Sequence, residues 1–194
     1  MKSAMILVVA AVGTGAWGNG VAGPVVTVCM DQFADSTVTY LAQREASKIF
    51  SEVTVQIAWR DGRACQSSDV IHIHLSNQTP PALRPGALAY ARLDQDNYIE
   101  VFYDRAANAV AAALLPRLLA HVLVHEITHN LQGVARHSET GIMKAHYTTD
   151  DYRQMSIRHL TFAPEDVTLI QQAMANRSER LEAARVTPSF PGSR

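Results

Sequence analysis

The chain has 194 residues, of which 47% are hydrophobic and 18% are charged, a composition that argues against an intrinsically disordered protein and fits one domain. Its 17 Lys and Arg residues against 18 Asp and Glu residues give a net charge of −1, which argues against nucleic-acid binding as the main function. The two cysteines are too few for a disulfide scaffold.

The N-terminus has the features of a secretory signal peptide. Lys2 is followed by an apolar run over residues 4–12 and then by small residues, and we place the cleavage site near Ala22. The apolar run is shorter than the ~20 residues that span a bilayer, which argues against a membrane anchor. We therefore predict a signal peptide over residues 1–22, a secreted or periplasmic protein, and no membrane association after cleavage.

Export would bring Cys29 and Cys65 into an oxidising compartment, where thiols pair. We predict a disulfide between them. Two buried free thiols would look the same in sequence and remain the alternative.

Strand-like and helix-like segments alternate after Pro24. The expected strands cover residues 25–30, 53–59, 70–75, 87–93 and 98–103. The first helix begins at Asp35 or Ser36, which are suitable N-cap residues. Residues 106–132 are helix-prone, and Pro116 suits the first turn of a helix better than its middle. A last helix opens at Pro164, with two acidic residues in its first turn.

Five strands and three helices predict a single α/β (α+β) layer domain, which we place at residues 23–184. Residues 185–194 are polar and contain proline, so a flexible tail is expected there. The strand–helix–strand order at the start predicts parallel pairing of the first two strands with a right-handed crossover.

Residues 125–129 read His-Glu-Ile-Thr-His, an H-E-x-x-H motif. On a helix, His125 and His129 lie one turn apart on one face, so both imidazoles reach one ion while Glu126 points beside them toward a water molecule. Zinc accepts two or three imidazoles and keeps a coordination position open. The apolar residues around the motif predict a buried helix. Two core histidines beside a surface glutamate are the simpler alternative.

The residues after the motif extend this pattern. Gly133 is placed to end the helix in the left-handed conformation. At this point the sequence resembles the metzincins, a family of zinc endopeptidases, and most of all their matrixin and archaemetzincin branches. The residues that match the family motif in order are His125, Glu126, His129, Gly133, His137 and Met143.

The resemblance implies a metzincin-like catalytic domain. Such a domain has a twisted five-stranded mixed sheet with an antiparallel edge strand, an active-site helix and a C-terminal helix. Met143 would lie beneath the metal as an apolar floor, although an ordinary core methionine would have the same sequence pattern. The segment that resembles the family's substrate-pairing edge strand consists of Leu88, Ala89, Tyr90 and Ala91.

His137 is expected to be the third zinc ligand, at a spacing that differs from the family. Gly133 follows His129 by four residues rather than three, and His137 follows Gly133 by four rather than three. Three extended residues span about 10 Å, which is enough to return an imidazole to the ion. The side chains that remain open as alternative third ligands are Glu139, His146 and Glu165.

Four further residues near the motif or on the third strand have their own expected roles. Tyr147 is a candidate contact to the metal or to a reaction intermediate, as a tyrosine is in some metzincins. His121, one turn before His125, is expected to pack rather than to bind the metal. His72 and His74 share one strand face and are expected to make solvent or loop contacts rather than a second metal site.

These features predict a secreted, monomeric, zinc-dependent endopeptidase with one catalytic zinc ion and peptide or protein substrates. Zinc would activate a water molecule by lowering its pKa to about 7. Glu126 would take the proton as general base and pass it to the leaving amine. The alternatives are a non-catalytic zinc-binding secreted protein and a gluzincin-like peptidase with a glutamate as third ligand.

Overall fold

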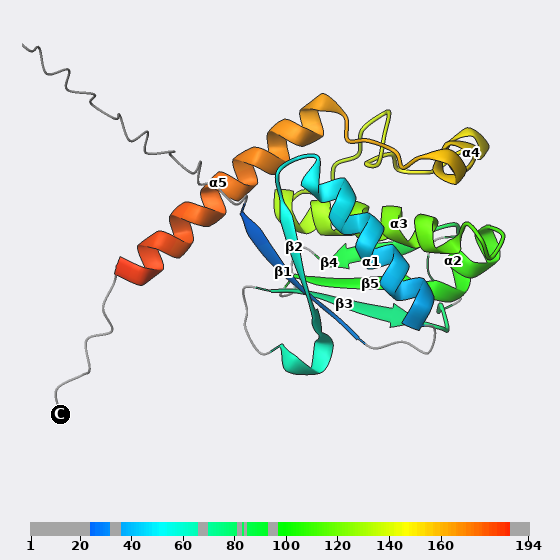
Figure 1. Cartoon of the computed structure of the whole chain (residues 1–194), viewed down its shortest axis with the longest axis horizontal. Coiled ribbons are helices and arrows are strands. Elements are labelled where there is room, and N and C mark those ends of the chain that lie inside the picture. Colours follow the sequence, from blue (N-terminus) through cyan, green and yellow to red (C-terminus); the bar gives the residue numbers. More distant parts are fainter. Residues whose placement is uncertain are drawn as a thin grey trace, which may run out of the picture.

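The structure is a computed structural model of the chain and describes residues 24–31, 36–65, 70–80, 83, 85–92 and 97–186 (Figure 1). The predicted signal peptide and residues 187–194 of the predicted tail lie outside the described residues. No helix in the described ranges combines the length and the hydrophobicity that a membrane span requires.

A five-stranded mixed sheet forms the centre of the domain, with the strand order β2-β1-β3-β5-β4. The strands are β1 (Val25–Met30), β2 (Gln56–Asp61), β3 (Ile71–Ser76), β4 (Ala89–Arg92) and β5 (Tyr98–Phe102). β1 pairs in parallel with β2 and β3, and β3 pairs in parallel with β5. β4 lies antiparallel to β5 at one edge of the sheet. The predicted mixed sheet, the parallel first pair and the antiparallel edge strand are confirmed.

Helices cover one face of this sheet. The helices are α1 (Ser36–Ser51), α2 (Tyr103–Ala109), α3 (Leu115–Gln132), α4 (Thr149–Ile157) and α5 (Pro164–Val186). α1 packs on β2, α3 packs on β4 and β5, and the two helices pack against each other (Figure 1). Along β3, buried apolar residues alternate with half-buried polar ones, because one side of the strand faces the helices.

The second strand begins three residues later than expected, because α1 ends in a turn that uses the first apolar residues of the segment 53–59. The backbone N–H groups of Val53 and Val55 both donate to the Phe50 carbonyl, at 3.1 Å each. Thr54 between them has a left-handed φ of 64°. Both valines are buried, as their alternation predicted, but they cap the helix rather than pair in the sheet.

The described residues form five α-helices where the sequence predicted three. The helix-prone region 106–132 is divided at Val110, which is extended, so that α2 and α3 are separate helices. Pro116 lies in the first turn of α3, as predicted. α4 was not predicted. It begins with a capping box, in which Thr148 accepts from the backbone of Asp151 and the Asp151 carboxylate accepts from the backbone of Thr148.

Cys29 and Cys65 form a disulfide, as predicted. Cys29 belongs to β1, and Cys65 follows the short 3₁₀ turn Gly62–Ala64 after β2. The bridge therefore ties the segment after β2 to the neighbouring strand β1.

Substitution of Gly141 and of Gly133 tests how closely the chain after α3 approaches the segment before α5. Both have positive φ, 75° and 66°, which costs ~1–2 kcal/mol for a residue with a side chain. A Cβ on Gly141 would lie 2.3 Å from the Thr161 carbonyl oxygen, whereas a Cβ on Gly133 would meet nothing within 4 Å. We expect Gly141→Ala to lower the free energy of unfolding by about 2 kcal/mol more than Gly133→Ala, measured by urea denaturation. Equal losses would contradict the close approach of Gly141 to Thr161.

His121 links α3 to the segment before α5 in a single protonation state. It is completely buried; its Nδ1–H donates to the Arg117 carbonyl (2.7 Å), and its Nε2 accepts from the Leu160 N–H (2.9 Å). Burial lowers the pKa of His121 to about 4 from an ordinary value near 6.5. The neutral ring therefore stabilises the fold above pH 6.5, and this contribution is lost as the pH falls toward 4.

We expect His121→Gln to reduce the acid sensitivity of the fold. In metal-free protein the stability advantage of wild type over the variant should shrink by about 3 kcal/mol between pH 7.5 and pH 4, at about 1.4 kcal/mol per pKa unit. Urea denaturation at a series of pH values measures this difference. Parallel stability curves for the two proteins would show that His121 does not titrate with unfolding.

Candidate metal centre

The motif histidines lie on a helix that is buried on all sides. Every residue of α3 from Leu118 to His129 is buried, because α1, the sheet and the returning chain surround it. The helix ends at Gly133, which has the predicted left-handed conformation and donates its N–H to the His129 carbonyl (2.9 Å). The chain then turns back along α3.

Two main-chain carbonyls orient the imidazoles of α3. The Nδ1 atom of His125 lies 2.9 Å from the Ile142 carbonyl oxygen, and that of His129 lies 2.9 Å from the Val134 carbonyl oxygen. A carbonyl oxygen can only accept a hydrogen bond, so each Nδ1 holds the proton and each Nε2 presents a lone pair. The two Nε2 atoms face each other at 3.0 Å. Two lone pairs at this separation repel unless a cation lies between them.

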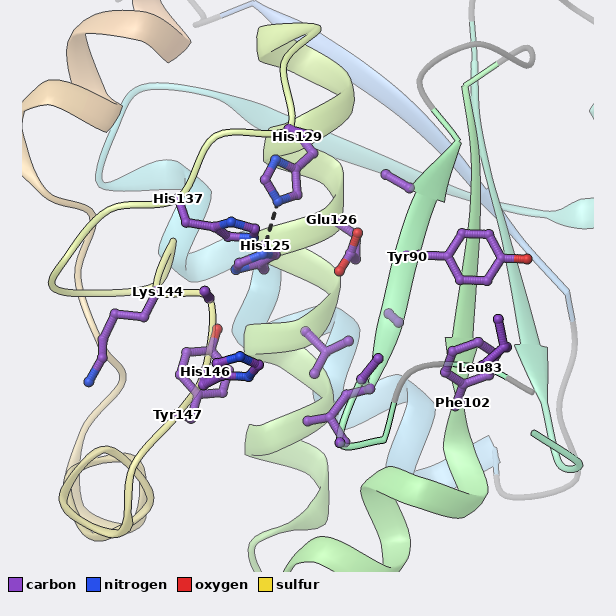
Figure 2. Close-up of a pocket in the computed structure, with 18 of the residues that line it drawn as sticks. Leu83, Tyr90, Phe102, His125, Glu126, His129, His137, Lys144, His146 and Tyr147 are labelled. Atoms are coloured by element: carbon purple, nitrogen blue, oxygen red, sulfur yellow. Dashed lines mark hydrogen bonds between the residues drawn. The ribbon is translucent and has the colours of Figure 1, made fainter. Parts of the chain in front are cut away.

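His137 completes a three-histidine group (Figure 2). It comes from the loop after α3, and its ring centroid lies 5.3 Å from that of His125 and 5.0 Å from that of His129. One ring nitrogen of each histidine lies within 4.8 Å of the others. The displaced spacing therefore still brings His137 to the other two. His137 is exposed, while His125 and His129 are only 9% and 6% exposed.

The donor set suits zinc. Burial lowers the pKa of His125 to about 4, and burial also lowers the pKa values of His129 and His137, so all three imidazoles favour the neutral form that binds metals. Two nitrogens on one tetrahedral zinc, each at ~2.05 Å, lie about 3.3 Å apart, close to the Nε2 separation described above. Nitrogen-rich, tetrahedral sites are those that zinc prefers.

Glu126 lies on the side of α3 that faces β4 (Figure 2). It is 7% exposed, and burial raises its pKa to about 8, an effect partly opposed by the backbone N–H of Ala91, which donates to the carboxylate. A buried carboxyl group next to a metal site is suited to accept and release a proton near neutral pH.

The outer edge of β4 borders the same cleft. The Phe102 N–H donates to the Leu88 carbonyl (2.8 Å), so Leu88 and Phe102 form a hydrogen-bonded pair. Hydrogen-bonded and non-hydrogen-bonded pairs alternate along an antiparallel ladder. The N–H and C=O groups of Ala89 and Ala91 must therefore point away from β5, in agreement with the contact between Ala91 and Glu126. The predicted segment contributes its backbone to the cleft at these two alanines. The Tyr90 side chain points away from α3 (Figure 2).

A cavity of about 650 Å³ lies between α3, β4 and the loop before α4. Its lining combines the three histidines and Glu126 with apolar side chains from all three elements. The main apolar residues are Leu83, Leu88, Phe102, Val122, Tyr147 and Tyr152. The cavity therefore joins a candidate metal centre to a space for an uncharged side chain.

Tyr147 lines the cavity, whereas Met143 is completely buried in the core, and its carbonyl accepts the Ser138 N–H (2.8 Å). A position of Met143 beneath a metal stays a prediction. The Tyr147 hydroxyl donates to the Ile142 carbonyl (2.8 Å), which also accepts from His125. Contact between Tyr147 and a metal or an intermediate stays a prediction, and it would require this hydrogen bond to break.

The alternative third ligands lie outside the histidine group. Glu139 lines a separate cavity beside α5. The Glu165 carboxylate pairs with Arg136 and lies 3.2 Å from the Ser138 hydroxyl. His146 lines the cleft but is not part of the group of three; no other group of three such ligands occurs among the described residues.

The remaining histidines have other partners. His121 holds the two hydrogen bonds described above, which is the packing role that was expected. His74 on β3 lies 2.7 Å from the Asp31 carboxylate, and His72 lies half-buried on the same face of β3.

Three backbone groups and one side chain near the centre were not predicted from sequence. The carbonyls of Val134 and Ile142 and the N–H of Ala91 are backbone atoms, which any residue supplies, so no sequence signal marks them. Asp166 was noted only as an acidic residue in a first helical turn, yet it is completely buried. The polar residues Arg136 and Ser138 on either side of His137, together with an acid at position 166, could have indicated a contact between this loop and α5.

Comparison with known proteins supports the fold. No protein-family model and no curated protein sequence matches the chain. The structure is similar to the crystal structure of archaemetzincin from Methanopyrus kandleri, with a TM-score of 0.54 over 80% of this chain and 98% of that chain. The sequence identity is 13%, so the likeness concerns the fold alone. The mixed α/β fold of this chain is thus archaemetzincin-like, whereas its resemblance to the matrixin branch stays a prediction.

Proposed function

We propose that the protein is a zinc-dependent endopeptidase. The observation that carries the proposal is the convergence of three imidazoles beside a buried glutamate, in a cleft bordered by outward-facing backbone groups of an edge strand. The archaemetzincin-like fold supports the proposal, because the sequence motif resembles that of the metzincins, to which archaemetzincin belongs.

In this proposal His125, His129 and His137 hold one zinc ion. Bound zinc supplies Lewis acidity and lowers the pKa of a water molecule to about 7. The hydrogen bonds from Nδ1 to main-chain carbonyls keep His125 and His129 in the correct tautomer before the ion arrives.

Glu126 acts as the general base. Its carboxylate takes a proton from the attacking water and delivers it to the amine nitrogen of the departing product. Its position on the cleft side of α3 puts it between the histidines and β4, where a bound peptide would lie (Figure 2).

The substrate is an extended peptide that binds along β4. The backbone groups of Ala89 and Ala91 that point away from β5 would pair with the main chain of the peptide, a mode that accepts many sequences. The apolar part of the cavity, whose lining includes Val122 on α3 and Tyr152 on α4, would take one uncharged side chain. We also propose that the mature protein is secreted or periplasmic and monomeric, in line with its disulfide.

We expect the purified mature protein to bind one zinc ion per chain. His137→Ala should lower the zinc affinity more than 100-fold, since loss of a ligand exceeds the ~10- to 100-fold effect of an outer contact. Glu139→Ala is the matched control and should keep the wild-type affinity. Zinc affinity is measured by competition with a coloured chelator. Retention of zinc by His137→Ala together with its loss by Glu139→Ala would replace the three-histidine site by a glutamate-completed one.

We expect Glu126→Gln to keep its zinc and to lose peptidase activity. Removal of a general base should lower kcat for casein or gelatin cleavage by ~10²- to 10⁴-fold. Zinc content is measured on the same preparations, so that loss of the metal is not mistaken for loss of the base. Wild-type protein that binds zinc but cleaves neither casein nor gelatin would favour the non-catalytic zinc-binding alternative.

A further inference from the structure

Asp166 is a buried carboxylate with partners on both sides of His137. It lies in the first turn of α5 and is completely buried. Its Oδ1 accepts from Arg136 Nη1 at 2.7 Å. The Ser138 hydroxyl lies 2.8 Å from each of its carboxylate oxygens. Asp166 therefore binds the residue before His137 and the residue after it.

The His137 ring lacks the restraint that the other two imidazoles have. His125 and His129 each donate Nδ1–H to a main-chain carbonyl. In the part of the chain that the structure describes, the His137 imidazole makes no such hydrogen bond, and it is exposed on a loop. Its direction must be set through its backbone, and thus through the residues on either side.

We propose that Asp166 is a positioning residue for metal binding, which acts by fixing Arg136 and Ser138 and so aims His137 at His125 and His129. The inference rests on the proposed function, because it needs His137 to be a metal ligand. Its chemical basis is preorganisation: an exposed loop histidine that is already aimed loses less conformational freedom when it coordinates an ion.

Two features show that this contact is more than an exposed ion pair. The Ser138 side chain is buried along with Asp166, so the hydroxyl contact is shielded from water. The Ser138 N–H also donates to the Met143 carbonyl, which closes the loop that carries Ile142, the hydrogen-bond acceptor of His125. Glu165 contacts the other nitrogen of the same arginine and lies 3.2 Å from the Ser138 hydroxyl, but it does so from the surface, where its side chain is 59% exposed.

The test compares Asp166→Asn, Ser138→Ala and the control Glu165→Ala. Affinity for zinc is measured by chelator competition, and cobalt(II) is used in parallel because its visible absorption reports the number of nitrogen ligands. We expect Asp166→Asn to weaken zinc binding ~10- to 100-fold and Ser138→Ala to weaken it in the same direction. Glu165→Ala should change it less than about 2-fold, because surface ion pairs contribute little.

A double-mutant cycle separates positioning from general stabilisation. In a His137→Ala background, Asp166→Asn should weaken zinc binding by a much smaller factor than in wild type, since its route through His137 has been removed. Melting of every variant in EDTA shows that the fold is retained, and Ser138→Ala serves if Asp166→Asn does not fold. The inference would be overturned if Asp166→Asn weakened zinc binding by the same factor in wild type and in the His137→Ala background. It would also be overturned if neither Asp166→Asn nor Ser138→Ala weakened zinc binding.

The cycle also distinguishes this inference from the proposed function. If His137→Ala leaves zinc affinity unchanged, the three-histidine site itself is wrong and the role of Asp166 falls with it. If His137→Ala weakens zinc binding while Asp166→Asn and Ser138→Ala do not, the site stands and only the positioning role is rejected.

Discussion

The candidate metal centre depends on hydrogen bonds from imidazole Nδ1 atoms to main-chain carbonyls. These bonds determine which nitrogen of His125 and of His129 carries the proton, and thus that the two unprotonated nitrogens face each other. Neither carbonyl belongs to α3. Both come from the chain that leaves the helix at Gly133 and returns past it, so the ligand geometry depends on the loop as much as on the helix.

Burying this site has an electrostatic cost that the structure distributes unevenly. Neutral imidazoles with hydrogen-bond partners are tolerated in a core, and burial lowers the pKa of His125 so that its ring favours the neutral form. Glu126 is the more costly group, because burial opposes its charged form. Asp166 is completely buried but bound to an arginine and a hydroxyl group, so its charge is compensated locally.

Much of the sheet could be predicted from sequence, since β-branched runs such as Val25–Met30 and Ile71–Ser76 mark strands that are buried on at least one face. The prediction failed where tertiary contacts outweigh local pattern. Val53 and Val55 alternate as in a strand, yet their N–H groups cap α1. α4 has only one buried residue, Met155, so it carries no apolar periodicity to reveal it.

The motif histidines and Glu126 could be predicted because their relation is local, four and one residues apart on one helix. For His137 the sequence could show only that the connector is long enough to bring the imidazole to the other two. The path of the loop could not be predicted, since it depends on contacts with distant parts of the chain. The hydrogen bonds that orient the ligands could not be predicted, because they are made by backbone atoms whose placement depends on the whole fold.

The Ile142 carbonyl accepts two hydrogen bonds and so connects His125 to Tyr147. The same oxygen accepts from His125, which faces the metal centre, and from Tyr147, which lines the cavity. A carbonyl that accepts two donors shares its electron density between them. A molecule in the cavity that drew the Tyr147 hydroxyl away would therefore strengthen the bond to His125 and raise the basicity of that imidazole. Occupancy of the cavity near Tyr147 would in this way act on the Nδ1 side of His125, the side opposite to the nitrogen that faces His129.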